Sequence, residues 1–179
     1  DVDEYGHWVI TTPESTYRAR KLVNAPGPWV DRLLHDTAPT KCRNEAQSVR
    51  LVKGSHIILP KMYDGDHCYI LQVGDNRIIF AIPYETDFTL IGTTDVDFNL
   101  EKNDEIYNIR ITDEEIQYLC ESVNENFKKQ ITPDDVLWTY SGVRPLLDES
   151  GPKDNYGEGE SASAVTRDYK LVKTHYKNA

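Results

Sequence analysis

Four apolar runs rich in β-branched residues follow one another through the middle of the chain, with no helix-forming segment between them. They lie at residues 49–60, 68–73, 77–84 and 88–94. A Gly-Asp-Asn sequence at residues 74–76 joins the second and third runs, and such sequences favour tight hairpin turns. Short apolar runs in direct succession predict strands that pair with their neighbours in an antiparallel sheet.

One long helix is predicted after these runs. Thr112 and, three residues later, Glu115 have the spacing of a capping box. The apolar residues that follow recur at helical spacing, and they are Ile116, Leu119, Cys120, Val123 and Phe127. Lys128 and Lys129 are expected in the last turn, where cations favour the helix dipole. Pro133 is expected to close the segment.

Shorter elements are predicted on both sides of this central part. The further strand-like runs are residues 7–12, 17–25, 136–147 and 164–173. Gly27 and Pro28 precede a short helix predicted from Trp29 to His35. The polar residues 36–48 are expected to form a loop, and the segment 148–163, rich in Gly, Ser, Asp and Glu, is expected to be mobile.

These elements predict an α+β fold with a mostly antiparallel sheet of about six strands, one long helix and short helices. Regular alternation of strands and helices is missing, which argues against a doubly wound parallel sheet. The sequence contains no GxGxxG motif. If a dinucleotide is involved, its main binding fold is therefore expected outside this chain.

Charge and cysteine content narrow the class of protein. The chain has 20 basic and 30 acidic residues, a formal net charge of −10, which argues against binding of nucleic acid and against direct contact with an anionic membrane. Cys42, Cys68 and Cys120 have no zinc-like spacing, so we expect no metal, and reduced, mostly buried thiols in the cytoplasm. No membrane span or signal peptide is visible. Because the chain begins with Asp in strand-like sequence, we expect it to be cut from a longer protein.

A Lys-Gly-Ser-His sequence interrupts the apolar run 49–60. Gly54 weakens a strand unless the backbone there must be approached closely. His56 is the residue type best suited to transfer a proton near neutral pH. A bend in the sheet that carries a structural histidine remains the alternative.

Two arginines lie in strand-like sequence of this acidic chain. Arg144 stands between Val143 and Pro145, in poorly solvated surroundings, and Arg167 lies in the run 164–173. A guanidinium offers a rigid fork of donors that fits carboxylate or phosphate oxygens. Structural ion pairs, for example between Arg167 and Asp168, remain the alternative to an anion pocket.

Two strand ends carry weaker signals. At residues 24–29 a strand ends in small residues just before a helix begins, which would let a ligand approach backbone amides. Residues 92–95, Gly-Thr-Thr-Asp, end another strand with two hydroxyl groups. Each pattern by itself is more typical of a turn than of a site.

Five motifs in series resemble the aerobic, FAD-dependent glycerol-3-phosphate dehydrogenases. They are Leu-Val-Asn-Ala-Pro-Gly-Pro-Trp-Val at 22–30, Lys-Gly-Ser-His at 53–56, Ile-Gly-Thr-Thr-Asp at 91–95, Trp-Thr-Tyr-Ser-Gly-Val-Arg-Pro-Leu at 138–146 and Thr-Arg-Asp-Tyr at 166–169. The resemblance covers nearly the whole chain. It implies oxidation of sn-glycerol 3-phosphate to dihydroxyacetone phosphate, with FAD reduced first and a membrane quinone afterwards.

The resemblance also implies roles for single residues. His56 corresponds to a substrate-site histidine, the candidate base, and Arg144 to an arginine near the reacting hydroxyl and the flavin. Arg167 corresponds to a phosphate-binding arginine. The segment that runs close to FAD corresponds to Ala25, Gly27, Pro28 and Trp29. Pro26 departs from the family, which usually has a small residue there, and it removes an amide donor.

The implied architecture is the substrate-binding, or cap, domain of a flavoprotein of the D-amino-acid oxidase type. Residues 1–36 are expected at the edge of the FAD domain or in the junction to it, residues 37–174 in the cap domain, and residues 175–179 in a tail or at the start of the return to the FAD domain. The family's phosphate-binding glycine loop is missing, so we expect no stable binding of FAD to this chain alone. The whole enzyme is expected in the cytoplasm, peripheral on the inner face of the membrane.

Two other functions stay open. A glycerol-3-phosphate oxidase, which passes electrons to oxygen, is disfavoured because such oxidases carry a large insertion and residues 148–163 are too few for it. A stand-alone anion-binding module is disfavoured by the strand-like first residues.

Overall fold

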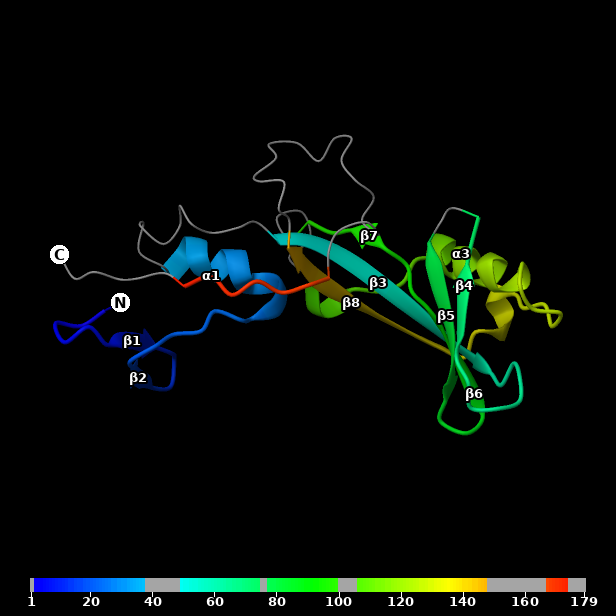
Figure 1. The fold of residues 1–179 in the computed structure, drawn as a ribbon, viewed down its shortest axis with the longest axis horizontal. Helices are drawn as coiled ribbons and strands as arrows, with labels where there is room; N and C mark the ends of the chain where they lie inside the picture. Colours follow the sequence, from blue (N-terminus) through cyan, green and yellow to red (C-terminus); the bar gives the residue numbers. More distant parts are fainter. Residues whose placement is uncertain (1, 38–48, 75–76, 100–105, 148–166, 174–179) are drawn as a thin grey trace. The chain divides into compact units, whose positions relative to one another are not determined.

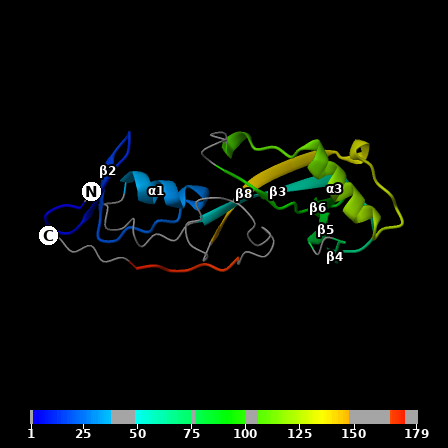
Figure 2. The same ribbon diagram turned by 90° about the horizontal axis from the view of Figure 1, so that it is seen from above.

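The computed structural model describes residues 2–37, 49–74, 77–99, 106–147 and 167–173. Contacts divide the chain into two compact units. The sheet unit comprises Leu51–Arg144 and Glu160–Ala164, and the N-terminal unit comprises Asp1–Arg50, Pro145–Gly159 and Val165–Ala179. Figures 1 and 2 show the elements of both units from two directions.

The sheet unit is built on a six-stranded sheet (Figure 1). Its strands are β3 (Val49–Pro60), β4 (Tyr69–Gln72), β5 (Ile78–Tyr84), β6 (Phe88–Gly92), β7 (Val96–Asp97) and β8 (Trp138–Leu147). The hydrogen-bonded order is β4-β5-β6-β3-β7, and β8 also pairs with β3. The pairs β3–β6, β3–β7, β4–β5 and β5–β6 are antiparallel. The predicted α+β class and the antiparallel sheet are therefore confirmed.

The predicted hairpin joins β4 to β5. Gln72 faces Ile78 in the register, and the Val73 N–H donates to the Arg77 carbonyl at 3.0 Å. Residues 75 and 76 of the turn lie outside the described part of the chain.

The long helix is α3 (Asp113–Asn124). Its capping box is confirmed, since the Thr112 hydroxyl accepts from the Glu115 N–H at 3.3 Å and the Glu115 carboxylate accepts from the Thr112 N–H at 2.9 Å. The predicted end was wrong, because Lys128 and Lys129 lie beyond the helix. Asn124 ends it early, since its side chain exchanges two hydrogen bonds of 2.8 Å with the backbone of Ile131.

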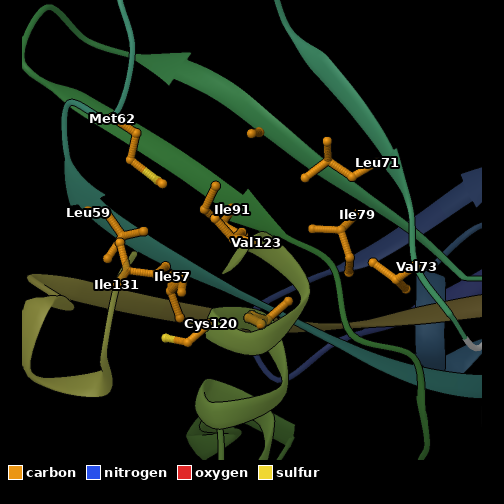
Figure 3. Close-up of a cluster of buried hydrophobic side chains, with 12 residues drawn as sticks. Ile57, Leu59, Met62, Leu71, Val73, Ile79, Ile91, Cys120, Val123 and Ile131 are labelled. Carbon is orange, nitrogen blue, oxygen red and sulfur yellow. The ribbon is translucent and has the colours of Figure 1, made fainter. Parts of the chain in front are cut away.

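The core lies between α3 and one face of the sheet (Figure 3). Strand and helix residues contribute side chains that are almost wholly buried, and they include Ile57, Leu59, Ile79, Ala81, Ile91, Leu119, Cys120 and Val123. Burial raises the pKa of the Cys120 thiol to about 11, so the thiol stays protonated. Cys68 is exposed, contrary to the expectation of mostly buried thiols, and Cys42 lies outside the described residues.

The described part of the N-terminal unit contains a two-stranded hairpin, a 3₁₀ turn and one α-helix. Strand β1 (Trp8–Thr11) pairs antiparallel with β2 (Thr16–Ala19), which is shorter than the predicted strand over 17–25. A 3₁₀ turn, η1 (Gly27–Trp29), leads directly into α1 (Val30–Thr37). The prediction of a helix here is confirmed, and Pro28 lies inside the 3₁₀ turn rather than before it.

The predicted strand over 164–173 was wrong in its described part. Residues 167–173 have no regular structure, and Tyr169 and Leu171 are each 87% exposed. Alternation of apolar and polar residues stabilises a strand only where a neighbouring strand and a core receive it. The predicted loop at 148–163, and all of 36–48 except its first two residues, lie outside the described part. No helix among the described residues is long and apolar enough to cross a membrane.

The capping box gives a first prediction. Thr112→Ala removes the hydroxyl that accepts from the Glu115 N–H, and we expect the free energy of unfolding to fall by about 1 kcal/mol. Urea denaturation measures this change. Gln117→Ala, an exposed substitution on the same helix, is the control and should change stability by less than about 0.5 kcal/mol. Equal effects from the two substitutions would show that the cap does not stabilise α3.

Candidate active site

Strand β3 carries different chemistry on its two faces, because successive side chains point to opposite sides of a sheet. Lys53 and Ser55 face α3, where both bind Glu115, and Ile57 enters the core on the same side. Gly54 and His56 therefore lie on the opposite face. The Lys-Gly-Ser-His motif thus contributes Lys53 and Ser55 to a buried polar contact with α3, and Gly54 and His56 to the opposite, open face of the sheet.

Arg144 of β8 lies over Gly54. A Cβ atom at Gly54 would overlap the Arg144 guanidinium, so the glycine provides the space that this side chain occupies. The fork is held by the segment after β6: Nη2 donates to Thr93 Oγ1 at 2.6 Å, and Nη1 donates to the Thr94 carbonyl at 3.4 Å. Nη1 also forms an ion pair of 3.3 Å with Asp95 Oδ1. The Arg144 side chain keeps 28% of its surface exposed, which leaves part of the cation accessible.

This packing gives a second prediction. Gly54→Ala should displace the Arg144 guanidinium and lower the free energy of unfolding by about 1–3 kcal/mol, as overpacking of a filled site does. Gly142→Ala on β8 is the matched control, because a Cβ atom there meets nothing within 4 Å. Thermal or urea unfolding of both variants measures the difference. A Gly54→Ala protein as stable as Gly142→Ala would contradict the observed position of Arg144.

His56 lies beside Arg144 on the open face. Its ring stacks on the Tyr140 ring with centroids 4.6 Å apart and planes 9° apart, and it fills the space that Gly92 leaves on the paired strand. The His56 Nδ1 atom is buried and accepts no hydrogen bond from the described residues. Burial and, second, the charge of Arg144 lower the pKa of His56 from its usual value of 6.5. The imidazole is therefore neutral at pH 7, and its buried Nδ1 has no partner among the described residues.

A buried polar network lies directly beneath this face. The Lys53 Nζ atom lies 2.6 Å from Glu115 Oε2, and both side chains are nearly fully buried. The Glu115 Oε1 atom accepts from Ser55 Oγ at 3.0 Å and from Thr94 Oγ1 at 2.7 Å. Burial tends to raise the pKa of Glu115, but hydrogen bonds from Lys53, Thr94, Thr112 and Ser55 outweigh it and lower the pKa. Glu115 is therefore an ionised carboxylate inside the unit.

The open face around His56 is otherwise apolar. Cross-strand register places Ile70, Phe80, Gly92 and His56 side by side along one row of the sheet. Other large side chains on this face are also exposed, and they include Ile78, Tyr84, Phe88, Trp138 and Tyr140. On this face His56 and Arg144 lie close together, an imidazole with a lowered pKa beside a guanidinium whose side chain is partly exposed.

The remaining predicted site residues belong to the N-terminal unit. Gly27 has a positive φ of 63°, and a Cβ atom built there meets nothing within 4 Å. The Asn24 Nδ2 atom donates to the Val30 carbonyl at 3.1 Å, whereas its buried Oδ1 atom has no partner among the described residues. Ala25 is exposed, and Pro28 and Trp29 are half-buried. Arg167 is exposed in a segment without regular structure. The structure brings His56 and Arg144 together in the sheet unit, whereas Arg167 belongs to the N-terminal unit.

Sequence reasoning missed several residues of the site. The Gly-Thr-Thr-Asp pattern is by itself more typical of a turn, yet Thr93, Thr94 and Asp95 hold the Arg144 guanidinium. The sequence pattern around Glu115 predicts only its place in the helix cap. The signal that pointed to its second role was Lys53, a charge placed inside an apolar strand.

The chain is similar to known proteins over most of its length. Residues 1–161 match the family described as FAD dependent oxidoreductase. A glycerol-3-phosphate dehydrogenase of Pseudomonas aeruginosa is 46% identical over 86% of this chain and 27% of its own length. A D-erythritol 1-phosphate dehydrogenase of Brucella abortus is 43% identical over 93% of this chain and 31% of its own length.

A solved structure extends the comparison to the fold. The crystal structure of the glycerol-3-phosphate dehydrogenase of Bacillus halodurans, complexed with FAD, matches 76% of this chain and 26% of its own length, with 34% identity and a TM-score of 0.62. The chain thus spans about a quarter to a third of the length of these relatives. On the evidence of the family match over most of its residues, this chain belongs to the FAD-dependent oxidoreductases.

Proposed function

We propose that this chain carries the substrate-binding part of an enzyme that oxidises sn-glycerol 3-phosphate to dihydroxyacetone phosphate. The observation that carries the proposal is the pair formed by a neutral His56 and the partly exposed Arg144 cation on one face of the sheet. Relatives that share 40–46% identity with the chain are named glycerol-3-phosphate dehydrogenases. The alternative of a stand-alone anion-binding module explains neither the neutral histidine beside Arg144 nor the family match.

His56 is proposed to accept the proton of the substrate hydroxyl. Oxidation of a secondary alcohol removes a hydride from carbon and a proton from oxygen, and FAD, when bound, accepts the hydride. The low pKa of His56 keeps the imidazole neutral before the reaction, as a base must be. The Tyr140 ring holds the imidazole plane against the sheet.

Arg144 is proposed to stabilise the negative charge that develops on the hydroxyl oxygen as its proton leaves. Thr93 Oγ1 and Asp95 Oδ1 fix the guanidinium before substrate binds, so little reorganisation is needed during the reaction. The exposed part of the fork provides the donors for the substrate oxygen. Because the charge is absent from the bound alcohol, this interaction favours the transition state over the ground state.

Residues 24–29 fit one edge of a flavin site. Gly27 leaves open space beside the backbone, and the buried Asn24 Oδ1 lacks a partner that a ligand donor would supply. Ala25, Gly27, Pro28 and Trp29 are proposed to line that edge. Pro26 offers no N–H there, and the sequence has no phosphate-binding glycine loop, so the main contacts to FAD belong to other residues.

Arg167 is proposed to bind the substrate phosphate. Its guanidinium fork suits a phosphate dianion, and the side chain is exposed in the N-terminal unit. Residues 37–174 are then the cap domain, residues 1–36 border the FAD domain, and residues 175–179 return towards it. We further propose that a membrane quinone receives the electrons, from an enzyme that is cytoplasmic and peripheral on the inner face of the membrane.

The similarity to a D-erythritol 1-phosphate dehydrogenase supports a second candidate substrate, a longer polyol phosphate. The complete FAD-loaded protein that contains this segment distinguishes the candidates. Under anaerobic conditions, glycerol 3-phosphate should bleach the flavin absorbance, whereas glycerol should not. Faster bleaching by D-erythritol 1-phosphate would show that the longer polyol phosphate is the preferred substrate. If neither phosphate bleached the flavin, the proposed function would be wrong. Addition of a quinone, or of oxygen, to the reduced protein then separates a dehydrogenase from an oxidase.

A further inference from the structure

Glu115 is more fully bound than a helix cap requires. Each of its two carboxylate oxygens accepts two hydrogen bonds: Oε1 from Ser55 and Thr94, and Oε2 from Lys53 and the Thr112 N–H. The four acceptor positions of a carboxylate are therefore all used. A capping box needs only the bond from the Thr112 N–H, so three of the four bonds serve another purpose.

Stability is a weak explanation for the Lys53–Glu115 pair. Both side chains are nearly fully buried, and the desolvation of two charges offsets most of their attraction. An apolar pair of the same volume would serve the core equally well. An ion pair that makes further hydrogen bonds fixes the position of every group bonded to it.

Thr94 connects Glu115 to Arg144. Its hydroxyl donates to Glu115 Oε1 and accepts from the Ser55 N–H at 3.0 Å, so the side chain has one orientation. Its carbonyl oxygen accepts from Arg144 Nη1, and from the Thr93 hydroxyl at 3.0 Å. The same Thr93 hydroxyl accepts from Arg144 Nη2. The segment that holds the fork is thus held in turn by Glu115.

Ser55 makes a second connection, to the strand that carries Arg144. The Ser55 hydroxyl has one proton, which it donates to Glu115, so it must accept from Ser141 Oγ at 2.9 Å. Ser141 lies on β8, three residues before Arg144. The Glu115 carboxylate is therefore linked both to β8, which carries Arg144, and to the Thr93–Thr94 segment, which binds its guanidinium.

We propose that Glu115, neutralised by Lys53, is a positioning residue that fixes the Arg144 guanidinium for its role in the reaction. This inference rests on the proposed function, in which Arg144 stabilises charge on the reacting oxygen. Glu115 does not touch the substrate. It acts through Thr94 and Ser55, from the face of the sheet opposite to the reaction.

The test uses the complete FAD-loaded protein. Glu115→Gln keeps the shape but turns an NH₂ group towards either the Lys53 and Thr112 donors or the Ser55 and Thr94 donors. We expect kcat per bound FAD to fall about 10–100-fold, the range for outer-shell groups at metal sites, with KM changed little. In the Arg144→Ala background, the same substitution should have almost no further effect on kcat, because the residue that it positions is gone.

Milder substitutions test the same role if Glu115→Gln does not fold. Thr94→Val keeps the side-chain shape and removes the hydroxyl, so kcat should fall, whereas Thr94→Ser should restore it. Val123→Ala takes two methyl groups from the core under the same helix and takes no part in the network. It should lower the thermal midpoint without changing kcat per bound FAD.

A readout without turnover completes the test. In ¹⁵N NMR spectra of the protein, the Arg144 Nη groups should be distinct in the wild type and averaged by rotation in Thr94→Val and Glu115→Gln. Unchanged spectra together with unchanged kcat, or effects that simply add to those of Arg144→Ala, would overturn the positioning role. Absence of flavin reduction in the wild type would overturn the proposed function instead, while the NMR comparison would still decide whether Glu115 fixes Arg144.

Discussion

Replacement of His56 by alanine is expected to slow flavin reduction by about 10²–10⁴-fold, the contribution of a general base. The imidazole is the proposed proton acceptor, and burial and the charge of Arg144 lower its pKa, which keeps it neutral. Anaerobic stopped flow of the complete enzyme with glycerol 3-phosphate measures this step directly. His67→Ala, which removes an exposed histidine of the same unit, is the control and should reduce flavin at the wild-type rate.

The pH dependence of the same step provides an independent check. Because the pKa of His56 is lowered from 6.5, the rate should rise with pH through a value below 6.5 and be level above it. The free energy of unfolding should also rise with pH in this range. His56 binds a proton more readily in the unfolded chain than in the folded protein, so stability falls as the pH drops below 6.5. Both effects should disappear in His56→Ala. An acid limb that persists in this variant, or an unchanged reduction rate, would remove His56 from the chemistry.

Arg144→Ala and Arg167→Ala are expected to differ in which kinetic constant they change. Arg144→Ala should lower kcat by about 10²–10³-fold, the cost of removing a donor to a developing oxyanion. Arg167→Ala should mainly raise KM, because a phosphate is held alike in the ground state and the transition state. It should also reduce the preference for glycerol 3-phosphate over glycerol. Arg167→Lys should restore part of the binding, since it returns the charge but not the fork.

Thermal stability must be measured beside these kinetics. Arg144 is part of the packing over Gly54, so its replacement is expected to lower stability as well as kcat. If both variants lost stability while the folded fraction kept the wild-type kcat, KM and phosphate preference, the two arginines would be structural ion pairs. The anion-pocket interpretation would then be wrong.

Much of the fold was predictable because its signals are local. The hairpin between β4 and β5 and the capping box at Thr112 depend on a few adjacent residues, and both are confirmed. The end of α3 was not predictable from periodicity, because Phe127 continues the apolar spacing while Asn124 already binds the backbone of Ile131. The strand expected over 164–173 is absent from its described part, 167–173, although apolar and polar residues alternate there. Alternation alone does not form a strand, because a strand also needs a neighbouring strand to pair with.

The site was predictable in its residue types but not in its connections. His56 and Arg144 could be selected because a histidine and an arginine are unusual in apolar strands, and the structure places them on one face. That Glu115 lies beneath them could not be inferred, because the contact joins Lys53 to a helix more than 60 positions later. Such pairings depend on strand order, which no local pattern contains.

The structure of the complete, FAD-loaded protein with bound dihydroxyacetone phosphate would test the central claim most directly. We predict that the carbonyl oxygen lies about 2.6–3.2 Å from both the His56 imidazole and the Arg144 guanidinium, within hydrogen-bond reach of each. The phosphate should contact Arg167. A product molecule bound away from the open face of the sheet, with His56 and Arg144 unchanged in their contacts, would contradict the assignment of this chain as the substrate site.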